Sequence, residues 1–410
     1  MSIPNTTLCE LAEAYGTPLY VYSRRTIVER FSALQTALAS IRPLICFAMK
    51  ANATLEILRT FHGQGAGFDI VSEGELRRVL KIDGDPSKVV FSGVGKTRDE
   101  IEFALQSRIK FFNVESLAEL DCLESVARSL NVKAPYCVRI NPDVDAQTHK
   151  HLTTGTKASK FGIAVTDAIE AVRARRDSAH LQFQGLDCHI GSQITDVAPL
   201  EEAYREVMRL AALFTSQGLA VRCLDLGGGF GISYSGHYAS LDMNKLSTMV
   251  ARVFGGCAYE FAVEPGRFLI AEAGSLLTRV LYLKDNQGRK FAVVDAGMND
   301  MVRPAMYDAY HQIDIVSPRS SSAVVASGVE TVDVVGPVCE SACYFARNRQ
   351  MTPIQTGDLL AIRDTGAYGA VMASNYNARR MPAEILVEED GTSEVIRRRD
   401  VYEDLWRNET

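Results

Sequence analysis

The strongest constraint on the fold is a regular alternation of short apolar runs and amphipathic stretches between Leu44 and Glu264. Runs this apolar are typical of parallel strands that are buried on both faces. The repeat extends over a span close to the roughly 250 residues of a (β/α)8 barrel. The eight predicted strands are Leu44–Met49, Phe68–Val71, Val89–Phe91, Lys110–Val114, Tyr136–Ile140, Phe183–Ile190, Val221–Leu226 and Phe261–Val263.

Helical periodicity between the apolar runs supports this interpretation. An open doubly wound sheet is the structural alternative, but eight regular units favour a closed barrel. The predicted helices include Glu73–Leu80, Arg98–Leu105, Leu117–Leu130, Asp167–Arg175 and Leu200–Gln217.

After Ala271 the pattern changes to short strands with hairpin signals, one of them at 285–288 and another at 389–392. The sequence therefore predicts an α/β protein with a TIM-like (β/α)8 barrel and a C-terminal antiparallel β-barrel or sandwich domain. We expect the barrel over 26–270, and the β domain over 1–25 and 271–410. A short β run, Leu19–Tyr22, is expected to pair with that domain.

Composition narrows the functional class. A chain of 410 residues with 47% hydrophobic and 23% charged residues is an ordinary globular protein, long enough for two domains. Its net charge of -6 argues against nucleic acid as a partner. Glu10 and Glu13 interrupt any signal-peptide core, and no apolar stretch is long enough for a membrane span, so a cytoplasmic protein is expected. The nine cysteines include no CxxC pair, and neither disulfides nor a metal site are predicted.

Lys50 ends the apolar run 43–49 and is followed by small residues. A lysine at the end of a buried strand tends to have a lowered pKa and a nucleophilic amine, which condenses with aldehydes such as that of pyridoxal phosphate. The alternative is a lysine that merely extends to solvent from a strand end.

Glycine loops follow the seventh and eighth predicted strands, where barrels often bind phosphate. Gly227, Gly228 and Gly229 follow one strand, and Glu264-Pro-Gly266-Arg267 follows the other. Backbone N–H groups in such loops can surround a phosphate without obstruction by side chains. The alternative for either loop is a tight turn without a ligand.

Three further polar side chains lie at predicted strand ends. His189 can stack on a planar ring, although a lone histidine is more often a core residue, and Ser192 can donate to phosphate. Asp69 can hydrogen-bond within the site or cap a helix.

These motifs resemble the fold-type III pyridoxal-phosphate decarboxylases, the alanine-racemase-like barrels. The resemblance implies that Lys50 bonds to the aldehyde of pyridoxal 5'-phosphate, that His189 stacks on its ring and that Glu264 pairs with the ring nitrogen. It further implies that the phosphate is held by Ser192, Gly227, Gly228, Gly229, Gly266 and Arg267.

The C-terminal segments 295–307, 335–341 and 364–370 resemble the diaminopimelate-decarboxylating branch of that family. That branch removes the D-centre carboxylate of meso-2,6-diaminopimelate, giving L-lysine and carbon dioxide in the last step of lysine biosynthesis. Arg303 and Tyr307, together with Arg267, can bind the carboxylate at the end that does not react. Glu340 can bind the ammonium group of the same end.

The resemblance also implies a homodimer with shared active sites, in which Cys339 and Glu340 enter from the partner subunit. Tyr368 is expected to contact cofactor phosphate and substrate. Cys339 or Lys50 is expected to return a proton to the α-carbon. The segment 153–162 resembles the family's substrate-covering loop, although an ordinary βα loop fits its sequence equally well.

Three alternative functions remain open. One is a racemase. A racemase generally needs a second base on the opposite face of the ring, and Tyr368 could be mistaken for that base. Another is a carboxynorspermidine-type decarboxylase of the same family. The third is a cofactor-binding protein without catalysis, against which the β domain and its Cys339-Glu340 motif argue.

Overall fold

The computed structural model describes residues 3–141, 160–234, 240–316 and 328–410. Its described residues divide into two compact units. The larger unit comprises Val28–Ser233 and Ala239–Leu269. The smaller comprises the described residues of 1–27 and 270–410, together with Tyr234.

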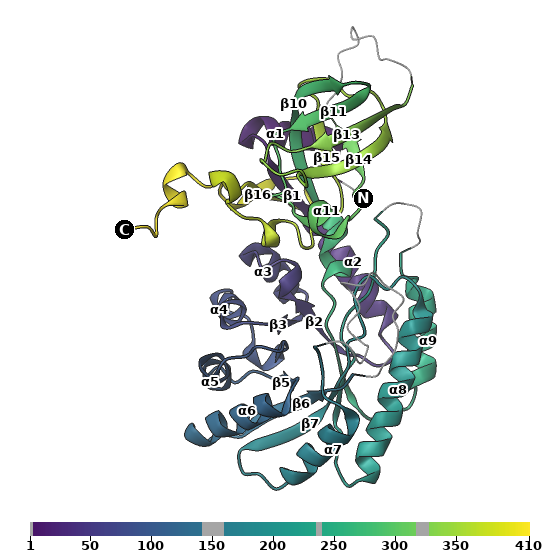
Figure 1. Ribbon diagram of the computed structural model, residues 1–410. Helices are drawn as coiled ribbons and strands as arrows, with labels where there is room; N and C mark the ends of the chain where they lie inside the picture. The colour runs from purple at the N-terminus through teal and green to yellow at the C-terminus, as the bar shows by residue number, and fades with distance from the viewer. Residues whose placement is uncertain (1–2, 142–159, 235–239, 317–327) are drawn as a thin grey trace. The chain divides into compact units, whose positions relative to one another are not determined.

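The larger unit is a closed barrel of eight parallel strands, as the alternation of apolar runs predicts (Figure 1). Each strand pairs with the next, and the last strand pairs with the first through Leu44–Ala262 and Ile45–Val263. This closure excludes the open-sheet alternative. The strands are β2 Leu44–Ala48, β3 Gly67–Ile70, β4 Val89–Phe91, β5 Phe111–Val114, β6 Ala134–Arg139, β7 Leu181–Asp187, β8 Cys223–Asp225 and β9 Glu260–Val263.

Helices connect the strands and lie outside them (Figure 1). The longest helix, α8, buries Leu200, Tyr204 and Val207 on one face, at the three- and four-residue spacing of a helix that packs on a sheet. Among the described helices, none has both the length and the apolar character that a membrane span needs. The helices are α2 Arg24–Ala37, α3 Leu55–Gly63, α4 Glu73–Lys81, α5 Arg98–Gln106, α6 Leu117–Ser129, α7 Val165–Ala174, α8 Val197–Ser216, α9 Met243–Phe254 and the short α10 Arg267–Ile270.

The smaller unit is built on a nine-stranded sheet that is mixed, whereas the sequence predicts an antiparallel one. The hairpins form as predicted, with Gln287 and Gly288 both at positive φ in the β10–β11 turn. Two pairs, β1–β16 and β11–β13, are parallel, and in each the strands are separated by the long connection that a parallel pair needs. The strands are β1 Leu19–Ser23, β10 Gly274–Asn286, β11 Arg289–Val294, β12 Ile313–Ile315, β13 Glu330–Val335, β14 Tyr344–Met351, β15 Leu359–Ile362, β16 Ala383–Val387 and β17 Ser393–Arg397.

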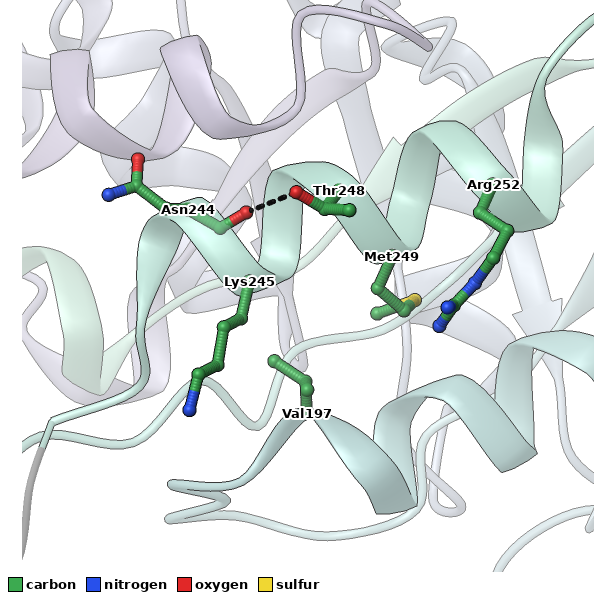
Figure 2. Close-up of a pocket in the computed structure, with 6 residues that line it drawn as sticks. All are labelled: Val197, Asn244, Lys245, Thr248, Met249 and Arg252. Atoms are coloured by element: carbon green, nitrogen blue, oxygen red, sulfur yellow. Dashed lines mark hydrogen bonds between the residues drawn. The ribbon is translucent and has the colours of Figure 1, made fainter.

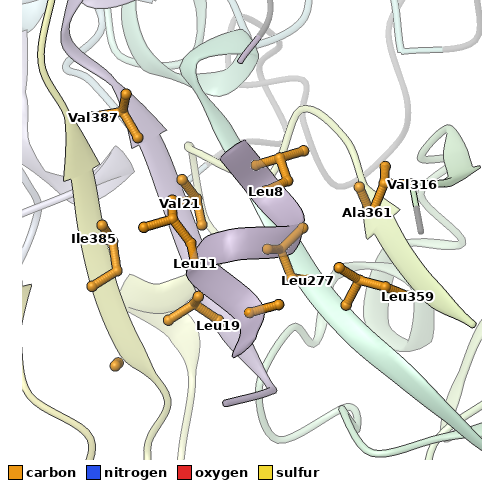
Figure 3. Packing of buried hydrophobic residues seen from close by; sticks show 12 residues of the cluster. Leu8, Leu11, Leu19, Val21, Leu277, Val316, Leu359, Ala361, Ile385 and Val387 are labelled. Carbon is orange, nitrogen blue, oxygen red and sulfur yellow. The ribbon is translucent and has the colours of Figure 1, made fainter. Parts of the chain in front are cut away.

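The N-terminal segment is an integral part of this sheet. β1 pairs with β10 and β16, which confirms the prediction for Leu19–Tyr22. Helix α1, Asn5–Tyr15, places Leu8 and Leu11 against apolar side chains of β1, β10, β15 and β16 (Figure 3). The core of the smaller unit therefore needs both ends of the chain.

Gly185 allows the close approach of β7 to β8 inside the barrel. One additional residue of β7, Gln184, lies between the pairs Tyr136–Phe183 and Cys137–Gly185, which forms a β-bulge. A Cβ atom on Gly185 would lie 1.8 Å from the backbone oxygen of Cys223. No side chain fits there without displacement of a barrel strand.

We therefore expect Gly185→Ala to lower the free energy of unfolding by at least the roughly 1–3 kcal/mol that overpacking costs. Urea denaturation of the purified variant measures the change. Gly95→Ala is the control, since a Cβ there has no neighbour within 4 Å and the residue is not at positive φ. Equal midpoints for the two variants would contradict the expectation.

Candidate active site

The carboxyl ends of the barrel strands hold a buried polar layer. Below it, Cys46, Val90, Phe111, Cys137, Cys223 and Ala262 form an apolar cluster in the barrel. Because side chains two residues apart on a strand share a face, the next inward positions stack above that cluster. We call these the strand-end layer, and each is at most 7% exposed. Its members are Ala48, Asp69, Ser92, Asn113, Arg139, Asp187, Asp225 and Glu264.

Hydrogen bonds join opposite sides of this layer. Asn113 on β5 donates from Nδ2 to Glu264 Oε1 at 3.1 Å and to Asp225 Oδ2 at 3.1 Å. Ser92 after β4 donates to the same Glu264 oxygen at 2.9 Å. Since β5 and β9 are four strands apart in an eight-stranded barrel, the Asn113–Glu264 bond crosses the interior.

Lys50 lies in a short 3-10 turn, Met49–Ala51, directly after β2. Its Nζ atom is 2.6 Å from Asp69 Oδ2, and the Lys50 side chain is 39% exposed whereas that of Asp69 is fully buried. The strand before Lys50 is buried as predicted, whereas the turn leaves the Lys50 side chain only partly buried. The result is an accessible amine held by a buried carboxylate.

His189 lies two residues beyond the end of β7 rather than within the predicted strand. Its Nδ1 atom accepts a hydrogen bond from Gly228 N at 3.0 Å, so the ring is bound to the predicted glycine loop. A Cβ atom on Gly228 would lie 2.2 Å from the backbone oxygen of Glu264. Only glycine permits this contact between the loops that follow β8 and β9.

The loop after β9 contacts both the first strand and the segment after His189. Arg267 donates from Nη2 to Ser192 Oγ at 3.2 Å. Ala48 N donates to Pro265 O at 3.0 Å, and a Cβ atom on Gly266 would lie 3.1 Å from that of Ala51. The barrel-side candidates Lys50, Asp69, His189, Ser192, Gly227, Gly228, Gly229, Glu264, Gly266 and Arg267 thus lie on neighbouring strand-end segments of one unit.

Burial dominates the electrostatics of the layer. It raises the pKa of the Glu264 carboxyl well above its usual range, and the nearby Asp225 and Asp69 raise it further. Burial likewise raises the pKa values of Asp187 and Asp225. It lowers the pKa of His189 well below its usual range, with Arg139 and Lys50 adding to the effect. The layer thus has more acidic groups than nearby cations, and His189 is neutral.

These residues fit pyridoxal phosphate. An exposed amine at Lys50 suits the aldehyde, and a neutral ring at His189 suits a flat pyridine. The carboxyl of Glu264, among acids that raise its pKa, is suited to a cation such as a protonated ring nitrogen. In the glycine loop, the N–H groups of Gly227 and Gly228 donate to Asp225 Oδ1 and His189 Nδ1, so a phosphate there would be bound by other groups around the loop, such as the Ser192 hydroxyl and Arg267.

The smaller unit holds Arg303 at the start of helix α11, Arg303–Tyr307. Arg303 is 6% exposed, and its Nη1 atom lies 2.7 Å from His311 Nε2. His311 Nδ1 lies 2.7 Å from the Arg363 carbonyl and donates to it, so Nε2 is the acceptor for Arg303. The ring of Tyr234 lies 4.7 Å from the guanidinium carbon. Arg303 is thus a buried cation held by a neutral histidine and an aromatic ring.

The other candidates of the smaller unit differ in exposure. Tyr307 and Tyr368 are partly buried, whereas Cys339 and Glu340 are exposed. Glu340 accepts a hydrogen bond from the Tyr376 hydroxyl. Tyr368 has a φ of 58°, in the left-handed region that costs a residue other than glycine roughly 1 kcal/mol.

Sequence reasoning missed the polar partners of Glu264. Ser92, Asn113, Arg139 and Asp187 were not predicted as site residues. A signal was present, since each is a polar residue two positions after an inward residue of its strand. Without the register of the barrel, however, that spacing does not reveal which strands face each other.

Two features lie outside this site. Residues 153–159 of the predicted covering loop are outside the described residues. A pocket between α8 and α9 is lined by residues of the barrel exterior, with Thr248 bonded to the Asn244 backbone (Figure 2). Its lining residues are Val197, Asn244, Lys245, Thr248, Met249 and Arg252, and none belongs to the strand-end layer.

Comparison with known proteins gives the class of protein that this fold and site define. Residues 24–271 match the family described as "Pyridoxal-dependent decarboxylase, pyridoxal binding domain".

Individual relatives are more specific. The diaminopimelate decarboxylase of Neisseria meningitidis serogroup B is 47% identical, over 98% of this chain and 97% of the relative. That of Pseudomonas aeruginosa is 47% identical, over 98% and 95%. The Helicobacter pylori diaminopimelate decarboxylase complexed with L-lysine has a TM-score of 0.92 and 40% identity, covering 98% of both chains. The chain belongs to the diaminopimelate decarboxylase family.

A carboxyl beside the Lys50–Asp69 pair makes stability depend on pH. Burial raises the pKa of Glu75 to about 7, with the hydrogen bond from Val71 and the charge of Lys50 opposing the rise. This pKa exceeds the value of roughly 4.3 for an unfolded glutamate. At a pH between the two values, the folded state therefore binds more protons than the unfolded state. The stability contributed by protonated Glu75 is therefore lost as the pH rises toward 7.

We expect Glu75→Gln to remove this loss, since the amide keeps an acceptor for Val71 N but does not titrate in this range. Urea denaturation of the apoprotein between pH 5 and pH 8 should show wild type losing stability relative to the variant as the pH rises. The control is Glu170→Gln, on the exposed face of α7. Parallel curves for wild type and Glu75→Gln would refute the assignment.

Proposed function

We propose that the chain decarboxylates meso-2,6-diaminopimelate at its D-centre with pyridoxal 5'-phosphate, giving L-lysine and carbon dioxide in the last step of lysine biosynthesis. One observation carries the proposal: a closed barrel that holds Lys50 and Glu264 at its strand ends, within a chain of this family. The structures of the Helicobacter pylori and "m. jannaschii" diaminopimelate decarboxylases in complex with L-lysine support L-lysine as the product.

The residues of 26–270 bind the cofactor in this proposal. When bound, pyridoxal phosphate supplies an aldehyde for the substrate amine and a ring that accepts the electron pair released with carbon dioxide. Lys50 would hold the aldehyde, and Asp69 orients its amine through the 2.6 Å contact. His189 would contact the ring, and Glu264 would favour the protonated form of the ring nitrogen. Around Gly227, Gly228 and Gly229, the phosphate is bound by Ser192, Gly266, Arg267 and Tyr368.

Residues of 1–25 and 271–410 supply the groups that select the substrate and form the dimer. Arg303 binds the carboxylate of the unreactive end, with Tyr307 and with Arg267 of the other segment. His311 supports this role, because its Nε2 atom accepts from the guanidinium and holds Arg303 in position. Glu340 binds the ammonium of the same end.

The proposed assembly is a cytoplasmic homodimer in which Cys339 and Glu340 of one subunit serve the site of the other. The exposure of both side chains in the single chain supports this arrangement. After carbon dioxide leaves, Cys339 or Lys50 returns a proton to the α-carbon. Sedimentation of the purified protein tests the assembly, and a monomer at working concentration would contradict it.

Incubation with meso-diaminopimelate tests the function. We expect equimolar carbon dioxide and L-lysine, detected by coupled assay and chromatography. An isomer mixture without carbon dioxide would indicate a racemase, and no turnover would indicate a binding protein. If carbon dioxide were released faster from carboxynorspermidine than from diaminopimelate, the proposed substrate would be wrong and the chain would be a carboxynorspermidine-type decarboxylase.

Replacement of Lys50 tests the covalent role of its amine. Lys50→Ala should abolish both turnover and the visible absorbance band of the bound cofactor, because no other amine of the site is assigned to the aldehyde. The matched control is Lys245→Ala, which removes an exposed lysine from the pocket of Figure 2. An unchanged band in Lys50→Ala would contradict the assignment.

Replacement of Arg303 tests substrate selection. Arg303→Ala should raise the KM for diaminopimelate roughly 10–100-fold, the effect of losing a charge-assisted hydrogen bond, with little change in cofactor affinity. Arg398→Ala is the control, because Arg398 is an exposed arginine paired with Asp404. An unchanged KM would mean that the distal carboxylate binds elsewhere.

A further inference from the structure

We propose that Asn113 and Ser92 are positioning residues that hold one oxygen of Glu264, so that its second oxygen is presented to the ring nitrogen of the cofactor. The inference rests on the proposed role of Glu264 and adds to it the groups that orient the carboxyl. Both residues belong to the strand-end layer and are at most 4% exposed.

All hydrogen bonds that the described residues make to the Glu264 carboxyl go to Oε1. The Ser92 hydroxyl lies 2.9 Å from it and Asn113 Nδ2 lies 3.1 Å from it. Ser92 has a single hydroxyl proton, and its oxygen in turn accepts from Asn113 at 3.1 Å. Ser92 and Asn113 thus both direct donors at Glu264 Oε1, and the two N–H protons of Asn113 are shared among Ser92 Oγ, Asp225 Oδ2 and Glu264 Oε1. Rotation of the Glu264 carboxyl out of its plane would weaken both bonds, whereas a half-turn only exchanges its two equivalent oxygens.

The orientation of the Asn113 amide follows from its neighbours. Its Nδ2 atom faces Ser92 Oγ, Asp225 Oδ2 and Glu264 Oε1. If the amide were reversed, its oxygen would face two carboxyl groups, and an amide oxygen has no proton to donate to them. The backbone is held as well, because buried Lys96 donates to Asn113 O at 2.8 Å and forms an ion pair with Glu119 at 2.7 Å.

Asn113 also links the two ends of the proposed cofactor site. Asp225 accepts from Asn113 through Oδ2 and from Gly227 N through Oδ1 at 3.1 Å. The same amide group thus connects the carboxyl assigned to the ring nitrogen with the first residue of the loop assigned to the phosphate. Placed between Asp225 and Glu264, its N–H donors also stabilise negative charge on two neighbouring acids.

The test compares two cofactors in the reconstituted protein: pyridoxal phosphate and its 1-deaza analogue, in which carbon replaces the ring nitrogen. Dissociation constants are measured by titration of the apoprotein. Wild type should bind pyridoxal phosphate more tightly than the analogue, since only the former offers a protonated nitrogen to Glu264. Asn113→Asp and Ser92→Ala should each reduce this preference about tenfold, as expected for loss of a hydrogen bond to a charged group.

Two controls separate positioning from packing. Ser92→Thr keeps the hydroxyl donor and should retain the preference. Cys223→Ala removes a buried side chain from the apolar cluster below and should lower stability without changing the preference. If Asn113→Asp does not fold, Ser92→Ala alone decides the outcome.

Two results would overturn the inference. In one, the folded Ser92→Ala variant, and Asn113→Asp where it folds, bind both cofactors with the wild-type preference. In the other, the variants lose affinity for both cofactors equally, which is the result of a structural role alone. If wild type itself shows no preference, the proposed role of Glu264 is wrong, and that failure is visible before any variant is made.

Discussion

Closure of the barrel is the constraint on which the proposed site depends. The backbone pairing of β2 with β9 brings residues more than 200 positions apart in sequence to the same edge. Lys50 follows the first of these strands and Glu264 follows the second. The hydrogen bond from Ala48 N to Pro265 O continues the pairing to the point where both side chains emerge. An open sheet would leave the two groups at opposite edges.

The interior of the barrel changes character over two residues. Cysteine, valine, phenylalanine and alanine side chains fill one layer, and the strand-end layer directly above it is almost entirely polar. Burial of several acids beside one arginine raises the pKa values of Asp187, Asp225 and Glu264. Burial of so many ionisable groups costs the folded protein free energy when no ligand is bound to them. A ligand with a protonated ring nitrogen and an aldehyde is suited to an environment that combines excess acid with an accessible amine.

The smaller unit contains a buried arginine in contact with a histidine. Arg303 is buried, and its partner His311 is a neutral acceptor in the tautomer set by the Arg363 carbonyl. In the barrel, by comparison, the buried Arg139 lies 3.1 Å from Glu115 Oε1 and 3.8 Å from Asp187 Oδ2. The Helicobacter pylori relative, at 40% identity and a TM-score of 0.92, has the same fold over nearly the whole chain.

The sequence by itself determined the eight barrel strands and the two hairpins, because these depend on local periodicity and turn chemistry, although β7 ends at Asp187 and not at the predicted Ile190. It also placed Lys50, Glu264 and the glycine loop after the strands that they follow. Tertiary structure decided the features that depend on contacts between distant parts of the chain. The turn after β2 directs Lys50 outward to Asp69, two parallel pairs make the second sheet mixed, and the barrel register sets Asn113 opposite Glu264. Each of these depends on which distant strands meet, and that is fixed only when the barrel and the sheet are formed.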